Sequence, residues 1–407
     1  MKILHTADWH LGKKLEGNSR LPEQEEFLQE LASIADTEQV DLILVAGDIY
    51  DTYNPPAAAE ALLYRFMLEL TRGGERPLLM IAGNHDHPER LSAVMPLAGP
   101  PGVMFAGLPG NVIPCGSYGQ AQVVDSGIGY VHFKLKGEQV VCLLLPYPSE
   151  KRMNELWTKT EEETEEQRRF SDRIAAFWQA ASSHYRNDTI NLALAHLYIA
   201  GGLGSDSERS IDVGGALAVD PEALPPAQYI ALGHLHRPQR APHSRVAYYA
   251  GSPLQYSRGE MHYSKSVYLV EVQAGQPAQI ERRWLRNYRP LAVWECSSIE
   301  EAVQQAQADP AFPGWLYLDI RTARPLTGAE IQTLKTAQPG IVQIRADWES
   351  EETVGEESTD QMKLRPDELF KSFYEHERGA EVPPELMKLF YEVNQQAEEK
   401  ADATVVP

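Results

Sequence analysis

Short apolar runs that end at a glycine or a polar side chain recur along the chain up to residue 236. One of them, residues 78–82, leads directly into the sequence GNHDH at residues 83–87. A run of this kind predicts a buried strand that delivers polar groups to one edge of a sheet. Four further runs have the same build: residues 3–7 before Asp8-Trp9-His10, 42–46 before Gly47-Asp48, 192–195 before His196, and 229–232 before Gly233-His234-Leu235-His236.

Helical patterns alternate with the first three of these strands, at residues 22–37 and 56–71. Such alternation predicts an α/β fold in which the strand ends lie on the same side of a sheet. We therefore expect a two-sheet core with helices outside. The second layer is predicted from apolar runs in the later part of this region: residues 140–145, 246–250, 266–272 and 280–285.

An acidic segment at residues 161–166 precedes one long helical pattern. Its apolar positions fall on a single face, which is typical of a helix that packs against a core. We expect this face to be packed in the interior rather than to line a ligand site. It consists of Phe170, Ile174, Phe177, Trp178 and Ala181.

A separate unit is predicted to begin near Pro290. Its pattern of strand, helix, strand, helix and strand predicts a compact α/β domain. The five elements are expected at residues 291–295, 299–308, 315–321, 327–336 and 341–348. An acidic linker that contains glycine and serine follows, from about residue 349 to 361.

Two short helices are expected beyond the linker, at residues 366–378 and 384–398. Each begins after a proline and carries an apolar stripe that two helices alone do not bury. The stripes therefore dock either on the rest of this chain or on a groove or coiled coil of another protein, and the pattern favours neither. They consist of Leu369, Phe370, Phe373 and Tyr374 in the first helix, and Leu386, Leu389, Phe390 and Val393 in the second.

Cysteine usage and the lack of long apolar runs indicate the compartment. The three cysteines, Cys115, Cys142 and Cys296, are far apart and odd in number, so neither a disulfide framework nor a Cys-x-x-Cys metal site is expected. The first apolar stretch is too short for a signal peptide. Since no apolar run approaches the roughly 20 residues of a membrane-spanning helix, we expect a soluble cytoplasmic protein that does not bind membranes.

The formal net charge of −21 argues against a protein that binds nucleic acid over its whole surface. Much of the acidic charge, however, lies in two blocks, residues 161–166 and 349–357. Basic residues gather elsewhere, so a locally positive surface remains compatible with the composition. They lie in residues 281–289 and at Arg237, Arg240, Arg245 and Arg258.

The polar groups at the strand ends form a set of metal ligands. Carboxylate, amide and imidazole donors without a thiolate suit Mn²⁺ or Fe, are compatible with Zn²⁺ and suit Mg²⁺ less well. Seven donors exceed what one tetrahedral ion needs, but they fit two ions that share a bridging carboxylate. Two divalent ions outweigh two aspartates in charge, so such a site attracts a phosphodiester. The donors are Asp8, His10, Asp48, Asn84, His196, His234 and His236.

The order of these motifs resembles that of the calcineurin-like metallophosphoesterases. Within that family the likeness to the SbcD nuclease subunits is closer still, and it extends over nearly the whole chain. The fold implied is the metallophosphoesterase sandwich. The segments that carry the likeness are residues 5–12 (HTADWHLG), 46–51 (AGDIYD), 83–86 (GNHD), 229–236 (YIALGHLH) and 249–253 (YAGSP).

The resemblance also implies a role for each donor. One Mn²⁺ would take Asp8, His10 and His236, and the other Asn84, His196 and His234, with Asp48 bridging the two. His85 would bind no metal; it would stabilise the transition state or protonate the leaving oxygen. Some relatives carry a histidine where this chain has Asp51, so no role is transferred to that residue.

The resemblance further implies a domain order and partners. Residues 1–288 would form the nuclease domain, 289–349 a domain that caps the DNA, 350–363 the acidic linker, and 364–407 the helices that bind SbcC, an ABC-type ATPase with a coiled coil. The activity implied is 3′–5′ exonuclease action on double-stranded DNA and endonuclease action on single strands and hairpins, by a homodimer within a heterotetramer. Two alternatives are a phosphatase or phosphodiesterase for small substrates and a docking scaffold without catalysis.

Overall fold

A computed structural model describes residues 1–149, 152, 163–208 and 218–348, and beyond these residues 370, 371, 374, 382, 383, 386 and 387. The chain divides into two compact units, Met1–Asp347 and Trp348–Pro407. The acidic linker and most of the two terminal helices expected from the sequence lie outside the described residues. In the second unit, the rings of Phe370 and Tyr374 lie 6.4 Å apart.

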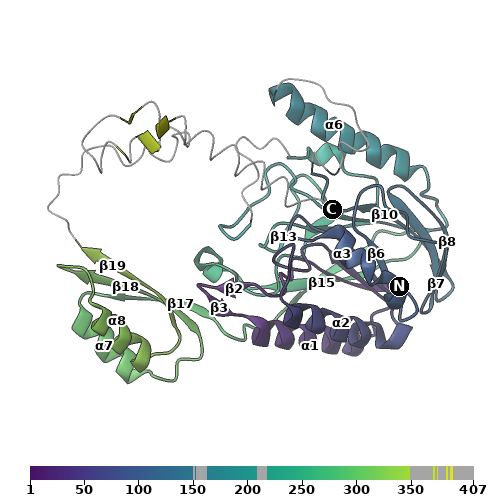
Figure 1. The fold of residues 1–407 in the computed structure, drawn as a ribbon. Coiled ribbons are helices and arrows are strands. Elements are labelled where there is room, and N and C mark those ends of the chain that lie inside the picture. The colour runs from purple at the N-terminus through teal and green to yellow at the C-terminus, as the bar shows by residue number, and fades with distance from the viewer. Residues whose placement is uncertain are drawn as a thin grey trace. The chain divides into compact units, whose positions relative to one another are not determined.

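The first sheet has six strands, and its centre is formed by the apolar runs of the N-terminal part (Figure 1). The strands formed by residues 2–6, 42–46, 78–81 and 103–106 run parallel, and the other two pair antiparallel at one edge. Parallel strands with their carboxyl ends at one edge were expected from the sequence, and this is confirmed. In spatial order the strands are β16 (Gln279–Trp284), β15 (Ser266–Glu271), β1 (Lys2–Thr6), β4 (Leu42–Ala46), β5 (Leu78–Ile81) and β6 (Val103–Ala106).

The second sheet has eight strands. Its centre is again parallel, because β10 pairs with β11, and β11 with β12, in the same direction. In spatial order the strands are β13 (Gln239–Arg240), β14 (Ala247–Tyr249), β12 (Tyr229–Gly233), β11 (Ile190–His196), β10 (Glu138–Leu145), β9 (Tyr130–Leu135), β8 (Ala121–Gly127) and β7 (Gly116–Tyr118).

The two sheets face one another across a shared apolar core. Leu44 and Ile81 of the first sheet belong to the same buried cluster as Phe133 and Leu192 of the second. Burying both inner faces removes two rows of apolar side chains from water, which favours the sandwich at about 25 cal/mol per Å². The predicted two-sheet core is thus confirmed.

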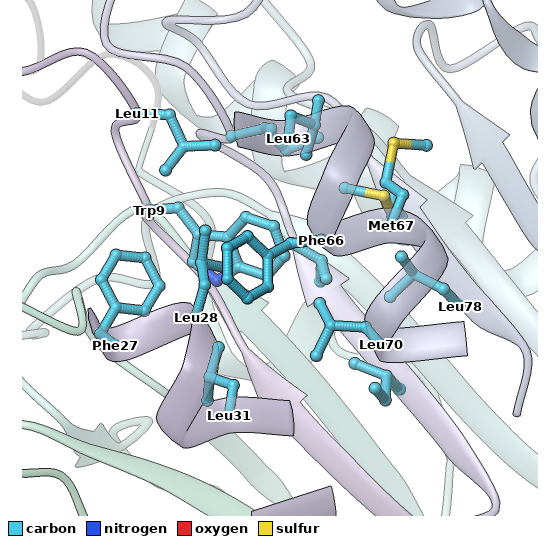
Figure 2. Close-up of a cluster of buried hydrophobic side chains, with 14 of the residues drawn as sticks. Trp9, Leu11, Phe27, Leu28, Leu31, Leu63, Phe66, Met67, Leu70 and Leu78 are labelled. Carbon is cyan, nitrogen blue, oxygen red and sulfur yellow. The ribbon is translucent and has the colours of Figure 1, made fainter. Parts of the chain in front are cut away.

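Helices α1 (Leu21–Thr37) and α2 (Ala57–Thr71) cover the outer face of the first sheet. Figure 2 shows how they do so: Phe27, Leu28 and Leu31 of α1 meet Leu63, Phe66, Met67 and Leu70 of α2 around the buried ring of Trp9. Trp9 follows β1, so this packing also fixes the segment that carries Asp8 and His10.

Helix α6 (Glu163–Ser182) covers the outer face of the second sheet. Phe170, Ile174, Trp178 and Ala181 are buried there and Phe177 is partly buried beside them, so the predicted apolar face packs against the core as expected. No helix among the described residues is both long and apolar enough to cross a bilayer. The remaining short helices of this body are η1 (Arg72–Gly74), α3 (Pro88–Ala93), α4 (Met95–Ala98), η2 (Pro221–Ala223) and η3 (Arg258–His262).

The region after Pro290 forms a three-stranded sheet with two helices on it, and each predicted element is confirmed to within two residues. A hydroxyl cap from Ser298 starts the first helix, and a capping box of Thr327 and Glu330 starts the second. The elements are β17 (Leu291–Cys296), α7 (Ile299–Ala308), β18 (Trp315–Thr322), α8 (Gly328–Ala337) and β19 (Ile341–Trp348), with strand order β17-β18-β19.

Polar contacts join this small sheet to the sandwich. The indole of Trp315 donates to Glu23 Oε1 of α1 at 2.8 Å. Arg258 of η3 donates two hydrogen bonds to the carboxylate of Asp319 of β18, from Nη1 to Oδ1 at 3.1 Å and from Nη2 to Oδ2 at 2.6 Å. Around them, Leu15 from the hairpin of β2 (Lys14–Leu15) and β3 (Asn18–Ser19) packs with apolar side chains of the small sheet.

Candidate metal centre

The five predicted strand ends meet at one place, where the carboxyl edges of the two sheets adjoin. The loop after β1 is bonded to the loop after β4, since Asp8 N–H donates to Gly47 O at 3.0 Å and His10 N–H to Asp48 O at 2.9 Å. From the second sheet, His234 N–H donates to Asp8 Oδ1 at 2.9 Å. The structure therefore brings all seven predicted donors together.

The backbone at this site is strained. Four of the donors have a positive backbone φ angle, which residues other than glycine seldom adopt: Asp8 (53°), His10 (46°), Asp48 (49°) and His234 (105°). Two neighbouring glycines allow the loops to approach, because a Cβ at Gly83 would collide with Asp48 and one at Gly233 with Ala46.

Asp48 lies between two groups of donors. Its Oδ2 atom is 3.6 Å from His10 Nε2 on one side and 3.5 Å from His196 Nε2 on the other. Its Oδ1 atom accepts the backbone N–H of His85 at 2.8 Å, which holds the carboxylate in place. A carboxylate in this position can contact two cations at once.

The first group contains His10 and His236, whereas Asp8 offers a ligand atom within 4.8 Å of those of Asp48 and His196. The Nε2 atoms of the two histidines are 2.9 Å apart, so both rings direct a nitrogen to the same point. Asp8 is fully buried, and its Oδ2 atom has no hydrogen-bond partner among the described residues. An unpaired buried carboxylate oxygen near a second carboxylate and an imidazole fits a bound cation.

The second group contains Asn84, His196 and His234. The Oδ1 atom of Asn84 is 2.9 Å from His196 Nε2 and 3.1 Å from His234 Nδ1. Three donor atoms from β5, β11 and β12 thus converge on a second point.

Outer contacts fix which ring nitrogen of each histidine faces inward. His196 Nδ1 donates to Ala46 O at 2.8 Å, which leaves the lone pair of Nε2 directed at Asn84. His236 Nδ1 lies 3.1 Å from Glu260 Oε1, which leaves its Nε2 free in the same way. These tautomers are assigned from the hydrogen-bond partners.

Buried charge supports the same conclusion. Burial lowers the pKa of both His10 and His234 to about 3, so these imidazoles are neutral, the form that binds a metal. Burial and then the charge of Asp48 raise the pKa of Asp8 well above its usual value. With its pKa raised, the buried Asp8 carboxyl needs a nearby cation to remain ionised near neutral pH, and the site therefore fits divalent metal.

His85 stands beside the first group without joining it. Its ring lies edge-on to His10, with centroids 4.6 Å apart, and its Nδ1 donates to the backbone carbonyl of Asp51 at 2.7 Å. Its other nitrogen, Nε2, is then the one free to act on a substrate.

His10, Asp51 and His85 offer ligand atoms within 4.8 Å of one another, which raises the question of a further metal site. Lys13 Nζ, however, lies 2.8 Å from Asp51 Oδ1. This ammonium already supplies the positive charge that another cation would bring. Asp51, to which the sequence assigned no role, instead supports His10, whose Nδ1 is 3.4 Å from the same oxygen.

Several supporting residues were missed by sequence reasoning. Glu260 of η3 is buried against His236, Ser207 and Lys265, and the ammonium of Lys265 also donates to His236 O at 3.0 Å. Asp86 accepts the N–H groups of Ile49, Tyr50 and Gly83 at 2.8 to 3.1 Å, so it clamps the Asp48 loop to the Asn84 loop. Burial and the nearby charge of Asp48 raise the pKa of Asp86 to about 7.

This fold and this donor set define the class of the protein as a metal-dependent phosphoesterase. Comparison with family models agrees: residues 1–238 match the calcineurin-like phosphoesterases, and residues 287–378 match a model described as the type 5 capsule protein repressor C-terminal domain, SbcD_C.

Known relatives narrow the class. The chain is 40% identical to the SbcD subunit of the SbcCD nuclease from Bacillus subtilis, over 95% of both chains. It is 34% identical to the corresponding nuclease subunit from Rhodobacter capsulatus, over 80% of this chain and 82% of the relative. Its identity to the Escherichia coli K12 subunit is 32%, over 87% of both. The chain belongs to the SbcD family of calcineurin-like phosphoesterases.

Proposed function

We propose that this protein is the nuclease subunit of an SbcCD-type complex and cleaves phosphodiester bonds in DNA. The observation that carries the proposal is the position of Asp48 Oδ2, about 3.5 Å from a histidine nitrogen of each donor group. The relatives named above add the substrate class, since their names describe a nuclease.

We further propose that the site holds two Mn²⁺ ions. Asp8, His10 and His236 would hold one, and Asn84, His196 and His234 the other, with Asp48 shared. When bound, the pair would supply a hydroxide nucleophile near neutral pH and neutralise charge on the phosphoryl oxygens. Mixed oxygen and imidazole donors suit Mn²⁺ or Fe, and metal analysis of the purified protein distinguishes these from Zn²⁺.

The residues of this chain have separate tasks in the reaction. The seven donors would hold the metals to which the phosphate binds, and Asp86 and Glu260 keep the loops that carry these donors in place. His85 would donate a proton or a hydrogen bond to the leaving oxygen. Its Nδ1–H stays on the carbonyl of Asp51, so a proton on Nε2 is the one that can pass to the leaving oxygen or stabilise negative charge there.

We test the function with the purified complex of this protein and SbcC, supplied with Mn²⁺. Linear duplexes with free or blocked ends and hairpin DNA are compared with p-nitrophenyl phosphate and cyclic nucleotides. We expect the complex to cleave DNA, and we expect cleavage to stop when the metal is chelated. Turnover of the small substrates alone would establish a phosphatase or phosphodiesterase, and intact DNA with no metal bound would establish a scaffold.

We also propose roles for the small α/β domain and for the assembly of the chain. Residues 289–349 would cap the DNA, which the anchoring of Trp315 and Asp319 to the sandwich supports. Two copies of the chain would assemble with SbcC. We also propose that the protein acts in the cytoplasm. All three cysteines are free thiols, which is typical of a reducing compartment, and DNA is present there.

Removal of residues 364–407 should abolish binding to SbcC and leave metal binding intact. The reason is the pair of apolar stripes, which require a partner surface to be buried. The measurement is a pull-down of SbcC with the truncated and full-length proteins, with metal content determined on each. Capture of SbcC at full strength by the truncated protein would show that the partner binds elsewhere.

A further inference from the structure

Tyr53 is an aromatic residue in the loop between Asp48 and α2. The residue is 40% exposed, and it belongs to none of the apolar clusters of the described residues. It comes two residues after Asp51, whose carbonyl holds His85. Pro55 and Pro56 follow and limit the freedom of this loop before α2 begins.

Arg152 ties Tyr53 to the loop that carries Asn84 and His85. Its guanidinium donates to Gly83 O, to Asp86 O and to the hydroxyl of Tyr53, each at 2.9 Å. Gly83 directly precedes Asn84, so the guanidinium lies beside the loop that contributes to the second donor group. A cation therefore lies between the exposed ring and the metal ligands.

A second aromatic ring borders the same place. The ring of His87 lies 5.3 Å from that of Tyr53, at an interplanar angle of 60°. On the inner side, the guanidinium of Arg152 lies 5.7 Å from the ring of Tyr147, which in turn stacks on His234. Aromatic and cationic groups thus continue from a metal ligand out to the surface.

This arrangement suits one nucleotide better than it suits an apolar partner. A cation attracts the phosphate, and an exposed ring offers a face to a base. A base in an intact duplex has both faces covered by its neighbours, so the base that stacks here is unpaired. Stacking on a tyrosine ring does not distinguish between bases, so this contact would not depend on the sequence of the DNA.

We propose that Tyr53, fixed by Arg152, binds the unpaired base of the nucleotide next to the scissile phosphate. This inference deepens the proposed nuclease function and rests on it. The nucleotide that occupies the site is defined by the phosphate bound at the metals: its base lies on the outer side, towards Tyr53 and His87.

The test uses the complex with SbcC and Mn²⁺, on DNA whose cleavage position is first mapped with the wild-type protein. Tyr53→Ala should lower kcat/KM roughly 10-fold. Tyr53→Phe keeps the ring and loses only the hydrogen bond from Arg152, so its rate should lie closer to that of the wild type than to that of Tyr53→Ala. When the nucleotide on the 5′ or the 3′ side of the mapped bond is replaced by an abasic analogue, one of the two substrates should be cleaved equally by Tyr53→Ala and wild type.

The results separate the two levels of inference. If the wild-type complex does not cleave DNA, the proposed function fails. If it does, and Tyr53→Ala cleaves equally well, or loses the same factor on both abasic substrates as on normal DNA, the base-binding site is refuted. A loss shared by abasic and normal substrates would mean instead that the ring contacts the partner or supports the loop.

A binding measurement gives a readout that does not depend on turnover. DNA with 2-aminopurine at the nucleotide identified by the abasic substrates is bound to the complex of the His85→Ala variant with Mn²⁺. Stacking on Tyr53 should quench the fluorescence of 2-aminopurine. The double variant that carries both His85→Ala and Tyr53→Ala should show the fluorescence restored. Equal fluorescence with and without the ring would refute the proposal.

Discussion

Replacement of His85 by alanine should lower kcat on DNA by roughly 10²- to 10⁴-fold while the protein keeps its full content of metal. The ring contributes no donor to either group, but its Nε2 is the free nitrogen beside them. The measurement pairs metal analysis of the purified variant with single-turnover cleavage of duplex DNA in the complex with SbcC.

His184→Ala is the matched control. His184 stacks on Tyr130 on the α6 side of the second sheet, so its removal should leave kcat unchanged. Cleavage by His85→Ala at the wild-type rate with bound metal would remove His85 from the mechanism. Loss of metal in that variant would instead make it a ligand.

Asp48→Asn should have an effect at least as large, because it acts on both metals. The substitution keeps the shape of the side chain and removes the negative charge that lies between His10 and His196. We expect at most one tightly held metal per chain and a loss of activity of roughly 10³-fold or more. Metal titration by calorimetry, followed by the DNA assay at saturating Mn²⁺, measures both.

Asp51→Asn provides the comparison for this result. It also removes a carboxylate next to His10, but one whose charge is balanced by Lys13. Its metal content should remain at two per chain. Two metals retained with normal affinity in Asp48→Asn would show that this carboxylate does not bridge the ions.

The order of strands and helices could be predicted because each long element carries a strong pattern. Runs such as residues 42–46 are wholly buried, and α7 and α8 have the polar caps that mark a helix start. The strands β2, β3 and β13 have only two residues each, too few to show any period. Their existence depends on tertiary contacts that a local pattern does not contain.

The same distinction applies to the site. The donors follow strand ends and can be found from the sequence, whereas Glu260 and Arg152 have no motif. Glu260 is 24 residues from His236, in a short helix, and its role follows only from the fold. Arg152 reaches Tyr53 across 99 positions of sequence. Supporting residues of this kind are specified by packing, not by spacing.

The positive φ angles at Asp8, His10, Asp48 and His234 have a consequence for how this protein can change over time. Conformations of this kind cost of the order of 1–3 kcal/mol each, and most of that cost disappears when a glycine replaces the strained residue. A glycine at one of these four positions would therefore relieve backbone strain but would also remove a metal donor. An SbcD relative from a thermophilic organism that keeps all of these donors must gain its stability at other positions of the sandwich.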